Sequence, residues 1–149
     1  MLQATRFFPE YQFVIAGAPS INQSLYNKII GKFDIPIIYG QTYQLLQQSR
    51  AALVTSGTAT LETALLNVPQ IVCYKTIAGN LLYKIGRMLI KVKYISLVNL
   101  ILGYEAVKEL TQTTLKKEII AKELDQILNN KQYREKMLDN YTKLSNIIG

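Results

Sequence analysis

One short segment, residues 52–64, combines residue types that could bind an anion. An apolar run leads into a turn of small and hydroxylated residues, and a helical pattern follows directly. A helix that starts after a strand leaves its first backbone N–H groups unpaired and presents the positive end of its dipole. Gly57 would let an anion approach the backbone, and the hydroxyls of Ser56, Thr58 and Thr60 could donate further hydrogen bonds. The segment therefore predicts a phosphate-binding turn.

Glu62 adds a more specific indication to this turn. It lies four residues after Thr58, so both side chains share one face of the first helical turns. A carboxylate would repel a phosphate lying directly on the helix end, but it is well placed to accept hydrogen bonds from the two hydroxyls of a ribose. The alternative is ordinary helix capping, with Glu62 favoured by the helix dipole. The pattern matches neither a P-loop nor GxGxxG, which argues against an ATPase or a dinucleotide-dependent dehydrogenase.

A second candidate is the basic stretch within residues 76–103, which holds four basic residues and no acid. If residues 81–92 are helical, their apolar side chains cover an arc of about 120°, and three of the basic residues lie within about 60° beside it. Such a helix suits an anionic membrane surface, or it packs on the sheet with its charges in solvent. The basic residues are Lys84, Arg87, Lys91 and Lys93.

Composition removes several kinds of chemistry. The 149 residues include no His, which excludes Ser-His-Asp and Cys-His catalysis and His-ligated metals. The single cysteine, Cys73, allows neither an intrachain disulfide nor a Cys-rich zinc site, as suits a reducing cytoplasm. Acids are few, 10 against 17 basic residues, so neither a metal site nor a cofactor is expected. The net charge of +7 is concentrated locally and not interleaved with aromatic residues, so nucleic acid is not an expected partner.

The element pattern predicts an α/β fold. Alternating strands and helices, with continuous apolar strands, are typical of a parallel sheet covered on both faces. We therefore expect a Rossmann-like parallel sheet flanked by helices, closed by a short fifth strand over 94–98. The other strands are predicted over 11–16, 35–39, 51–55 and 70–74, with helices over 22–30, 43–48 and 58–66.

The rest of the chain reads as trailing helices over 104–110, 116–128 and 133–147, giving a division into 1–115 and 116–149. Their apolar stripe needs cover, so we expect it to be left exposed or to pair with a second copy in a homodimer. The opening residues read as the end of a helix stopped by Pro9, which indicates a piece of a longer protein. No apolar run is long enough to span a bilayer, and no secretion signal is evident.

Several blocks together resemble the carboxyl-terminal domain of lipid-A-disaccharide synthases, which are inverting GT-B glycosyltransferases of the lipopolysaccharide pathway. The resemblance covers nearly the whole chain and implies the C-terminal half of a GT-B fold. It implies a reaction that joins UDP-2,3-diacylglucosamine to 2,3-diacylglucosamine 1-phosphate through a β(1→6) bond and releases UDP, without a metal. The blocks are residues 56–62, Val68-Pro69, Tyr74-Lys75, residues 93–100 and residues 107–110.

The resemblance also implies roles for individual residues. Ser56, Gly57 and Thr58 would cradle the diphosphate, and Glu62 would hold the ribose. Asn99 matches an asparagine of the nucleotide-sugar site, although a turn residue at the end of the last strand is an alternative. Thr60 and Lys75 are possible further contacts, with Lys75 standing where many members carry arginine, whereas Tyr74 is predicted to pack in the core. No catalytic residue is expected in this chain, because the general base and the acceptor site belong to the family's amino-terminal domain.

The expected partners follow from the same resemblance. They are the UDP moiety of the donor, a lipid acceptor bound through the other domain, and an anionic membrane surface met by the four basic residues of 76–103. The expected location is cytoplasmic and peripheral, at the inner face of the inner membrane. Two alternatives remain open: another GT-B nucleotide-sugar enzyme, such as a UDP-sugar epimerase or a peptidoglycan glycosyltransferase, and a non-catalytic flavodoxin-like ligand or interaction module.

Overall fold

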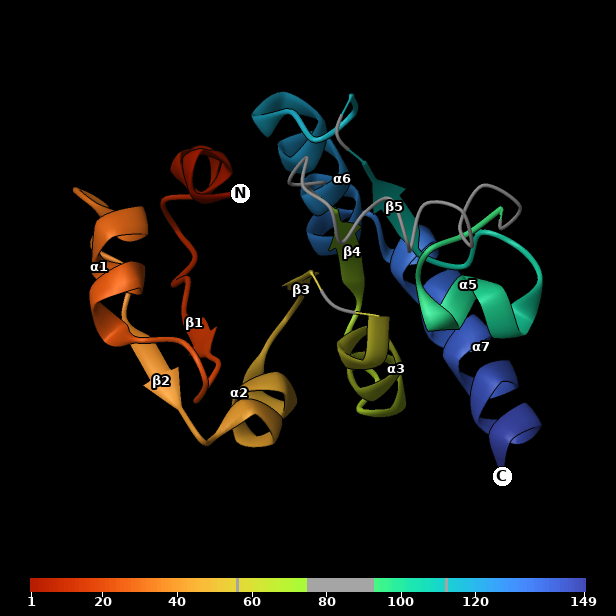
Figure 1. Cartoon of the computed structure of the whole chain (residues 1–149). Helices are drawn as coiled ribbons and strands as arrows, with labels where there is room; N and C mark the ends of the chain where they lie inside the picture. Colours follow the sequence, from red (N-terminus) through yellow and green to blue (C-terminus); the bar gives the residue numbers. More distant parts are fainter. Residues whose placement is uncertain (56, 75–92, 112) are drawn as a thin grey trace.

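The computed structural model describes residues 1–55, 57–74, 93–111 and 113–149. It confirms the expected α/β class, with parallel strands flanked by helices (Figure 1). The helix predicted over 81–92 lies outside the described residues. Five of the residues singled out above also lie outside them: Ser56, Lys75, Lys84, Arg87 and Lys91.

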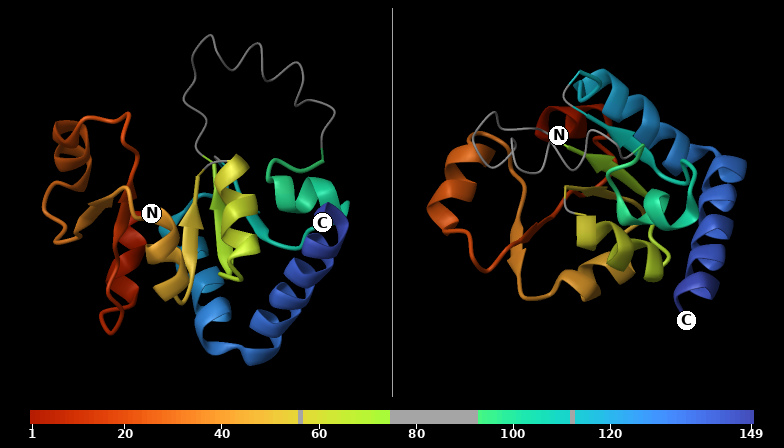
Figure 2. Two further views of the ribbon diagram at one scale, coloured as in Figure 1. Left: turned by 90° about the horizontal axis from the view of Figure 1, so that it is seen from below. Right: turned by 45° about the vertical axis from the view of Figure 1, so that its right-hand side comes forward.

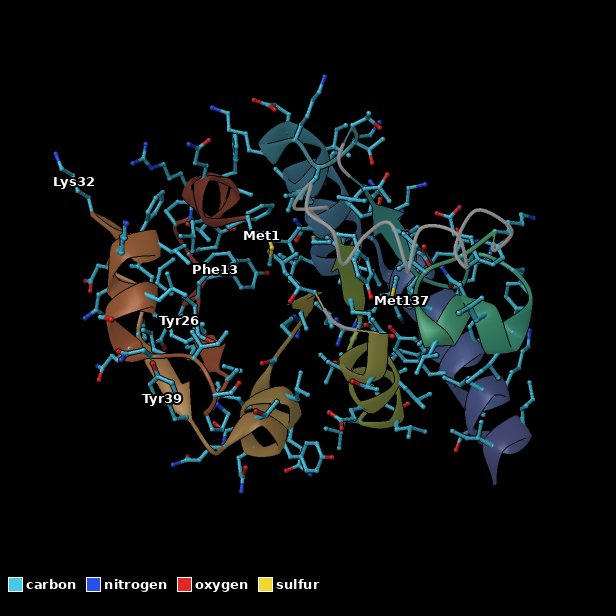
Figure 3. The ribbon with its side chains drawn as sticks, in the orientation of Figure 1. Met1, Phe13, Tyr26, Lys32, Tyr39 and Met137 are labelled. Atoms are coloured by element: carbon cyan, nitrogen blue, oxygen red, sulfur yellow. The ribbon has the colours of Figure 1, made fainter. Side chains whose placement is uncertain are left out.

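The amino-terminal third forms a small parallel pair of strands (Figure 1). Strand β1 pairs with β2, and Gly17 lies opposite Tyr39. A Cβ added to Gly17 would lie 2.6 Å from Cδ1 of Tyr39, so only glycine allows this ring to pack there. The Tyr39 ring also meets that of Tyr26 edge to face, with centroids 5.9 Å apart (Figure 3). The elements are the 3₁₀ helix η1 (Leu2–Phe7), β1 (Ile15–Gly17), α1 (Gln23–Ile30), β2 (Ile37–Tyr39) and α2 (Thr42–Gln48).

A three-stranded parallel sheet forms the centre of the molecule, in the order β3-β4-β5. The middle strand, β4, is buried along its whole length. Helices α3 and α5 pack against each other on one side of this sheet, and α6 packs on β4 from the other (Figure 2). The sheet thus has the two covered faces that its apolar strands predict. The elements are β3 (Ala52–Val54), α3 (Gly57–Leu65), β4 (Gln70–Cys73), α5 (Leu97–Leu102), β5 (Lys108–Leu110), α6 (Lys117–Asn129) and α7 (Lys131–Ile148).

Two predicted elements between 94 and 110 are wrong. Residues 97–102 form helix α5 and not the end of a fifth strand, because the Ser96 hydroxyl accepts a hydrogen bond from the Asn99 N–H, 3.2 Å away, and starts a helix. Gly103, with φ of 77°, ends that helix. Residues 108–110, predicted as helix, form strand β5 beside β4. The described strands also lie in two sheets and not in one.

The two final helices agree with the prediction, and most of their apolar stripe is buried within this chain, although Ile147 and Ile148 at the end of α7 are exposed. Ile120, Leu124 and Ile127 of α6 are buried, and so are Met137 and Tyr141 of α7. They share one core with the central sheet, and helix η1 packs against α6. The stripe therefore gives no support for a homodimer.

Candidate functional site

The predicted phosphate turn lies where expected, between the end of β3 and the start of α3. Helix α3 begins at Gly57, so its first N–H groups lie beyond the carboxyl end of a parallel strand, where such sheets bind ligands. A Cβ built on Gly57 meets a single atom within 4 Å, the hydroxyl of Tyr74 at 3.6 Å. The space above the Gly57 backbone is therefore open to a ligand as far as the described residues are concerned.

The predicted residues of α3 divide into two groups. Thr58 and Glu62 are exposed and share one face of the helix, and the Glu62 carboxylate forms no ion pair within the described part of the chain. Thr60 is fully buried, and its hydroxyl donates to the Gly57 carbonyl at 2.6 Å. Thr58 and Glu62 therefore lie on the solvent-facing side of α3, whereas the buried Thr60 stabilises the turn from the core side.

A buried glutamine fixes the position of α3. Gln70, at the start of β4, is inaccessible to solvent, and its Nε2 donates to the Thr60 carbonyl at 2.8 Å. Its own backbone N–H points at Sδ of Met137 on α7, 3.4 Å away (Figure 3 labels Met137). These contacts attach the first turn of α3 to the sheet and to α7. The backbone donors of the turn are thus held rigidly, which favours anion binding.

Tyr74 has a second role that the sequence did not reveal. It packs against the core, as predicted, yet its hydroxyl lies beside Gly57 at the carboxyl end of β4. Burial and the nearby Glu109 carboxylate raise the pKa of Tyr74, so the hydroxyl stays protonated at neutral pH. It can therefore donate a hydrogen bond at the turn. The sequence signals at this position were the end of the strand predicted over 70–74 and the Tyr74-Lys75 block of the resemblance, and neither indicated the hydroxyl's place at the turn.

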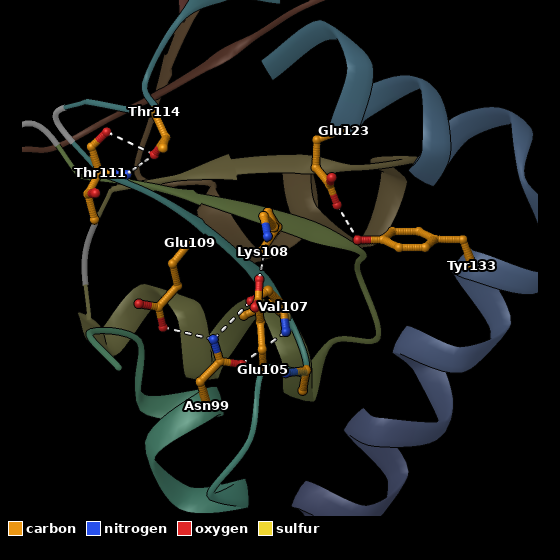
Figure 4. Close-up of polar contacts among 10 residues, drawn as sticks. Asn99, Glu105, Val107, Lys108, Glu109, Thr111, Thr114, Glu123 and Tyr133 are labelled. Carbon is orange, nitrogen blue, oxygen red and sulfur yellow. Dashed lines mark hydrogen bonds and ion pairs between the residues drawn. The ribbon is translucent and has the colours of Figure 1, made fainter. Parts of the chain in front are cut away.

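Asn99 is enclosed rather than exposed to a ligand. Its side chain has no solvent-accessible surface, and it sits in α5, not in a turn after a strand. The Nδ2 group donates to the Val107 carbonyl at 2.9 Å and to Glu109 at 2.8 Å, while Oδ1 accepts from the backbone N–H groups of Ala106 and Val107 (Figure 4). Both donors and both lone pairs of the amide are thus used within the protein.

A pocket of about 390 Å³ lies beside Asn99. Lys93, the described member of the basic stretch, borders it, with Nζ 5.2 Å from the centre of the Tyr94 ring. Lys108 also borders it and forms an ion pair with Glu105 at 2.9 Å, a contact that raises the pKa of Lys108 and keeps it charged. Lys93 was predicted to contact a membrane surface, and Asn99 to contact the nucleotide sugar. The structure places both residues at one pocket.

Other chemistry finds no support among the described residues. Cys73 is 2% exposed, and burial raises the pKa of its thiol to about 11, so it is not a reactive nucleophile at neutral pH. No group of three or more Cys, Asp or Glu residues able to hold a metal occurs in the described ranges. None of the helices described there is long and apolar enough to cross a membrane.

Comparison with known proteins decides the family. A family model described as lipid-A-disaccharide synthetase matches residues 2–148. This chain belongs to that family. A lipid-A-disaccharide synthase of Syntrophus aciditrophicus is 40% identical over 156 aligned positions, covering 100% of this chain and 40% of that protein. The synthase of the same name from Psychromonas ingrahamii is 37% identical and covers 97% of this chain and 38% of its own length.

The family match confirms the resemblance seen in residues 56–62, 93–100 and 107–110. It also favours this family over the epimerase, the peptidoglycan glycosyltransferase and the flavodoxin-like module that the sequence left open. The chain spans about two fifths of the length of these synthases. The relatives in these comparisons are named as lipid-A-disaccharide synthases.

Proposed function

We propose that this chain is the donor-binding half of an inverting glycosyltransferase. The whole enzyme would join UDP-2,3-diacylglucosamine to 2,3-diacylglucosamine 1-phosphate and release UDP. The chain would correspond to the C-terminal half of a GT-B fold, with a nucleotide-sugar-binding part over 1–115 and carboxyl-terminal helices over 116–149. The lipid acceptor and the general base would belong to the other half, so we assign no catalytic residue to this chain.

One observation carries the proposal: helix α3 starts at the carboxyl edge of the sheet with Gly57, and Thr58 and Glu62 are exposed on one face behind it. The backbone at the start of α3 and the helix dipole would stabilise a diphosphate there without a metal. Glu62, one helical turn further on, would accept the two hydroxyls of the ribose. Ser56 keeps its proposed role as a diphosphate contact, and Lys75 its place as a possible further contact, on the grounds of the family pattern.

We also propose that the whole enzyme acts in the cytoplasm at the inner face of the inner membrane. The support is the concentration of Lys84, Arg87, Lys91 and Lys93 in a stretch without acids. Anionic headgroups attract such clusters. A peripheral location would also bring the enzyme to its diacylated substrates.

Calorimetry on this chain with UDP and ADP tests the proposed function. We expect UDP to bind more tightly than ADP, and Glu62→Ala to weaken UDP binding by roughly 10-fold or more, because hydrogen bonds to a charged group contribute about 1.5–3 kcal/mol. Glu118→Ala is the matched control, since Glu118 is likewise an exposed glutamate near the start of a helix, α6. Equal affinities for UDP and ADP, or an unchanged UDP affinity in Glu62→Ala, would contradict the proposal.

A further inference from the structure

The carboxylate of Glu109, on β5, accepts four hydrogen bonds from the segment that leads into α5 (Figure 4 shows the contact with Asn99). Oε2 accepts from the N–H of Ile95 at 2.8 Å. Oε1 accepts from the N–H of Ser96 at 2.9 Å, from its hydroxyl at 2.8 Å and from Nδ2 of Asn99 at 2.8 Å. The Glu109 carboxylate therefore lies at the N-terminus of α5, where its negative charge interacts favourably with the helix dipole.

Asn99, in the first turns of α5, forms further hydrogen bonds with the turn that precedes β5. Its Oδ1 accepts from the N–H groups of Ala106 and Val107 at 2.8 and 3.0 Å, and its Nδ2 donates to the Val107 carbonyl. Through these bonds, the start of α5 is fastened both to β5 and to the turn before β5. We call Glu109, Asn99 and Ser96 the α5 latch. Every member hydrogen-bonds to another, so the segment 94–96 is held in one position.

The α5 latch forms one wall of the pocket of about 390 Å³ described above. The other charged groups at this pocket are Lys93, Glu105 and Lys108, so two ammonium groups face two carboxylates. A lining with balanced charge and many hydrogen-bonding groups suits a neutral, hydroxyl-rich ligand better than an anion. Because the α3 turn is open and the end of α5 is already filled by a carboxylate, a diphosphate is expected at α3 and not in this pocket.

Tyr74 connects the pocket to the α3 turn. Its hydroxyl lies near Gly57, and the Glu109 carboxylate is near enough to help raise the pKa of Tyr74. Helices α3 and α5 also pack against each other. The α3 turn and the α5 latch thus belong to two helices in contact, as a ligand that extends from a diphosphate on α3 to this pocket requires.

We propose that Glu109 is a positioning residue that holds residues 94–96 and Asn99 so that this pocket receives the hydroxylated sugar ring attached to the diphosphate. The inference rests on the proposed function. Asn99 then contributes to nucleotide-sugar recognition through the latch and not by direct contact. Glu109 acts by the same route, since all four of its hydrogen bonds go to the protein.

The test compares UDP with UDP-N-acetylglucosamine by calorimetry on this chain, with folding followed by urea unfolding. We expect the wild-type chain to bind the sugar nucleotide more tightly than UDP. Glu109→Ala should weaken sugar-nucleotide binding by about 10-fold and UDP binding by less than about 3-fold. Glu109→Gln keeps an oxygen for Ser96 and Asn99 and should recover most of the loss. Glu118→Gln, an exposed change on α6 outside this pocket, should leave both affinities within about 2-fold.

The outcomes separate the inference from the proposed function. If the wild-type chain binds UDP but gains nothing from the sugar, or if Glu109→Ala weakens both ligands equally, the inference is wrong and the proposed function stands. If neither ligand binds, both are wrong. Where Glu109→Ala does not fold, Glu109→Gln carries the test, with an expected loss of about 3-fold for the sugar nucleotide and none for UDP; equal losses contradict the inference.

Discussion

Replacing Gly57 with alanine is expected to leave the fold intact and to weaken UDP binding by roughly 30-fold or more. Among the described residues, the new methyl group would meet the Tyr74 hydroxyl alone, at 3.6 Å, which is ordinary van der Waals contact. Alanine also favours a helix over glycine by about 1 kcal/mol in helix interiors, so stability should not fall. The same methyl group would occupy the space through which a diphosphate reaches the backbone N–H groups, each worth about 1.5–3 kcal/mol to a charged partner.

Calorimetry with UDP and urea unfolding of the same variant measure the two effects separately. Gly103→Ala is the matched control, because Gly103 ends α5 with φ of 77°, a conformation that alanine adopts only with strain. That control should lose stability and keep its UDP affinity, the reverse of Gly57→Ala. If Gly57→Ala binds UDP as tightly as the wild type, the backbone of the α3 turn is not part of the UDP site.

Replacing Asn99 with leucine is expected to lower the free energy of unfolding by about 3–5 kcal/mol. Leucine nearly matches asparagine in shape, but it would leave the N–H groups of Ala106 and Val107 without their partner and would remove one of the four hydrogen bonds that Glu109 accepts. Each buried group left unpaired costs about 1–3 kcal/mol. A domain of this size is stable by only about 5–15 kcal/mol, so the loss would be evident in urea unfolding.

Asn129→Leu is the control for this variant, because Asn129 is exposed on α6 and bonds only to Asp125 there. It should change the free energy of unfolding by less than about 0.5 kcal/mol. The informative contrary result is an Asn99→Leu chain that is as stable as the wild type yet does not bind UDP. That result would indicate that Asn99 contacts the ligand directly, and it would contradict the structural role of Asn99 in the α5 latch.

The sequence predicted most elements whose signal is local. The helix predicted over 22–30 corresponds to α1, which the Asn22 side chain caps by accepting a hydrogen bond from the Ser24 N–H. The run that became β4 is apolar on both faces, as expected of a central strand. The phosphate turn was also recognisable, because strand, small residues and helix follow one another within residues 52–64.

Residues 94–110 could not be predicted in the same way, because long-range contacts decide their structure. The run Ile95 to Leu102 is apolar enough for a strand or a helix, and Ser96 with Glu109 selects the helix. Lys108 and Glu109 have the charged side chains typical of an exposed helix surface. They lie in β5 because this segment pairs with β4 as a parallel strand. Glu109 therefore gave no sign of its role, which depends on a partner 13 residues away at Ser96.

The most direct test of the central claim is an NMR titration of the ¹⁵N-labelled chain with UDP. Binding of the diphosphate at the start of α3 predicts that the largest amide shift changes occur at Gly57, Thr58 and Ala59, the first N–H groups of that helix. Smaller changes are expected at Glu62 and Tyr74, which lie beside the ligand in this account. Saturable changes confined to α1 or α6, with the amides of 57–59 unmoved, would contradict it.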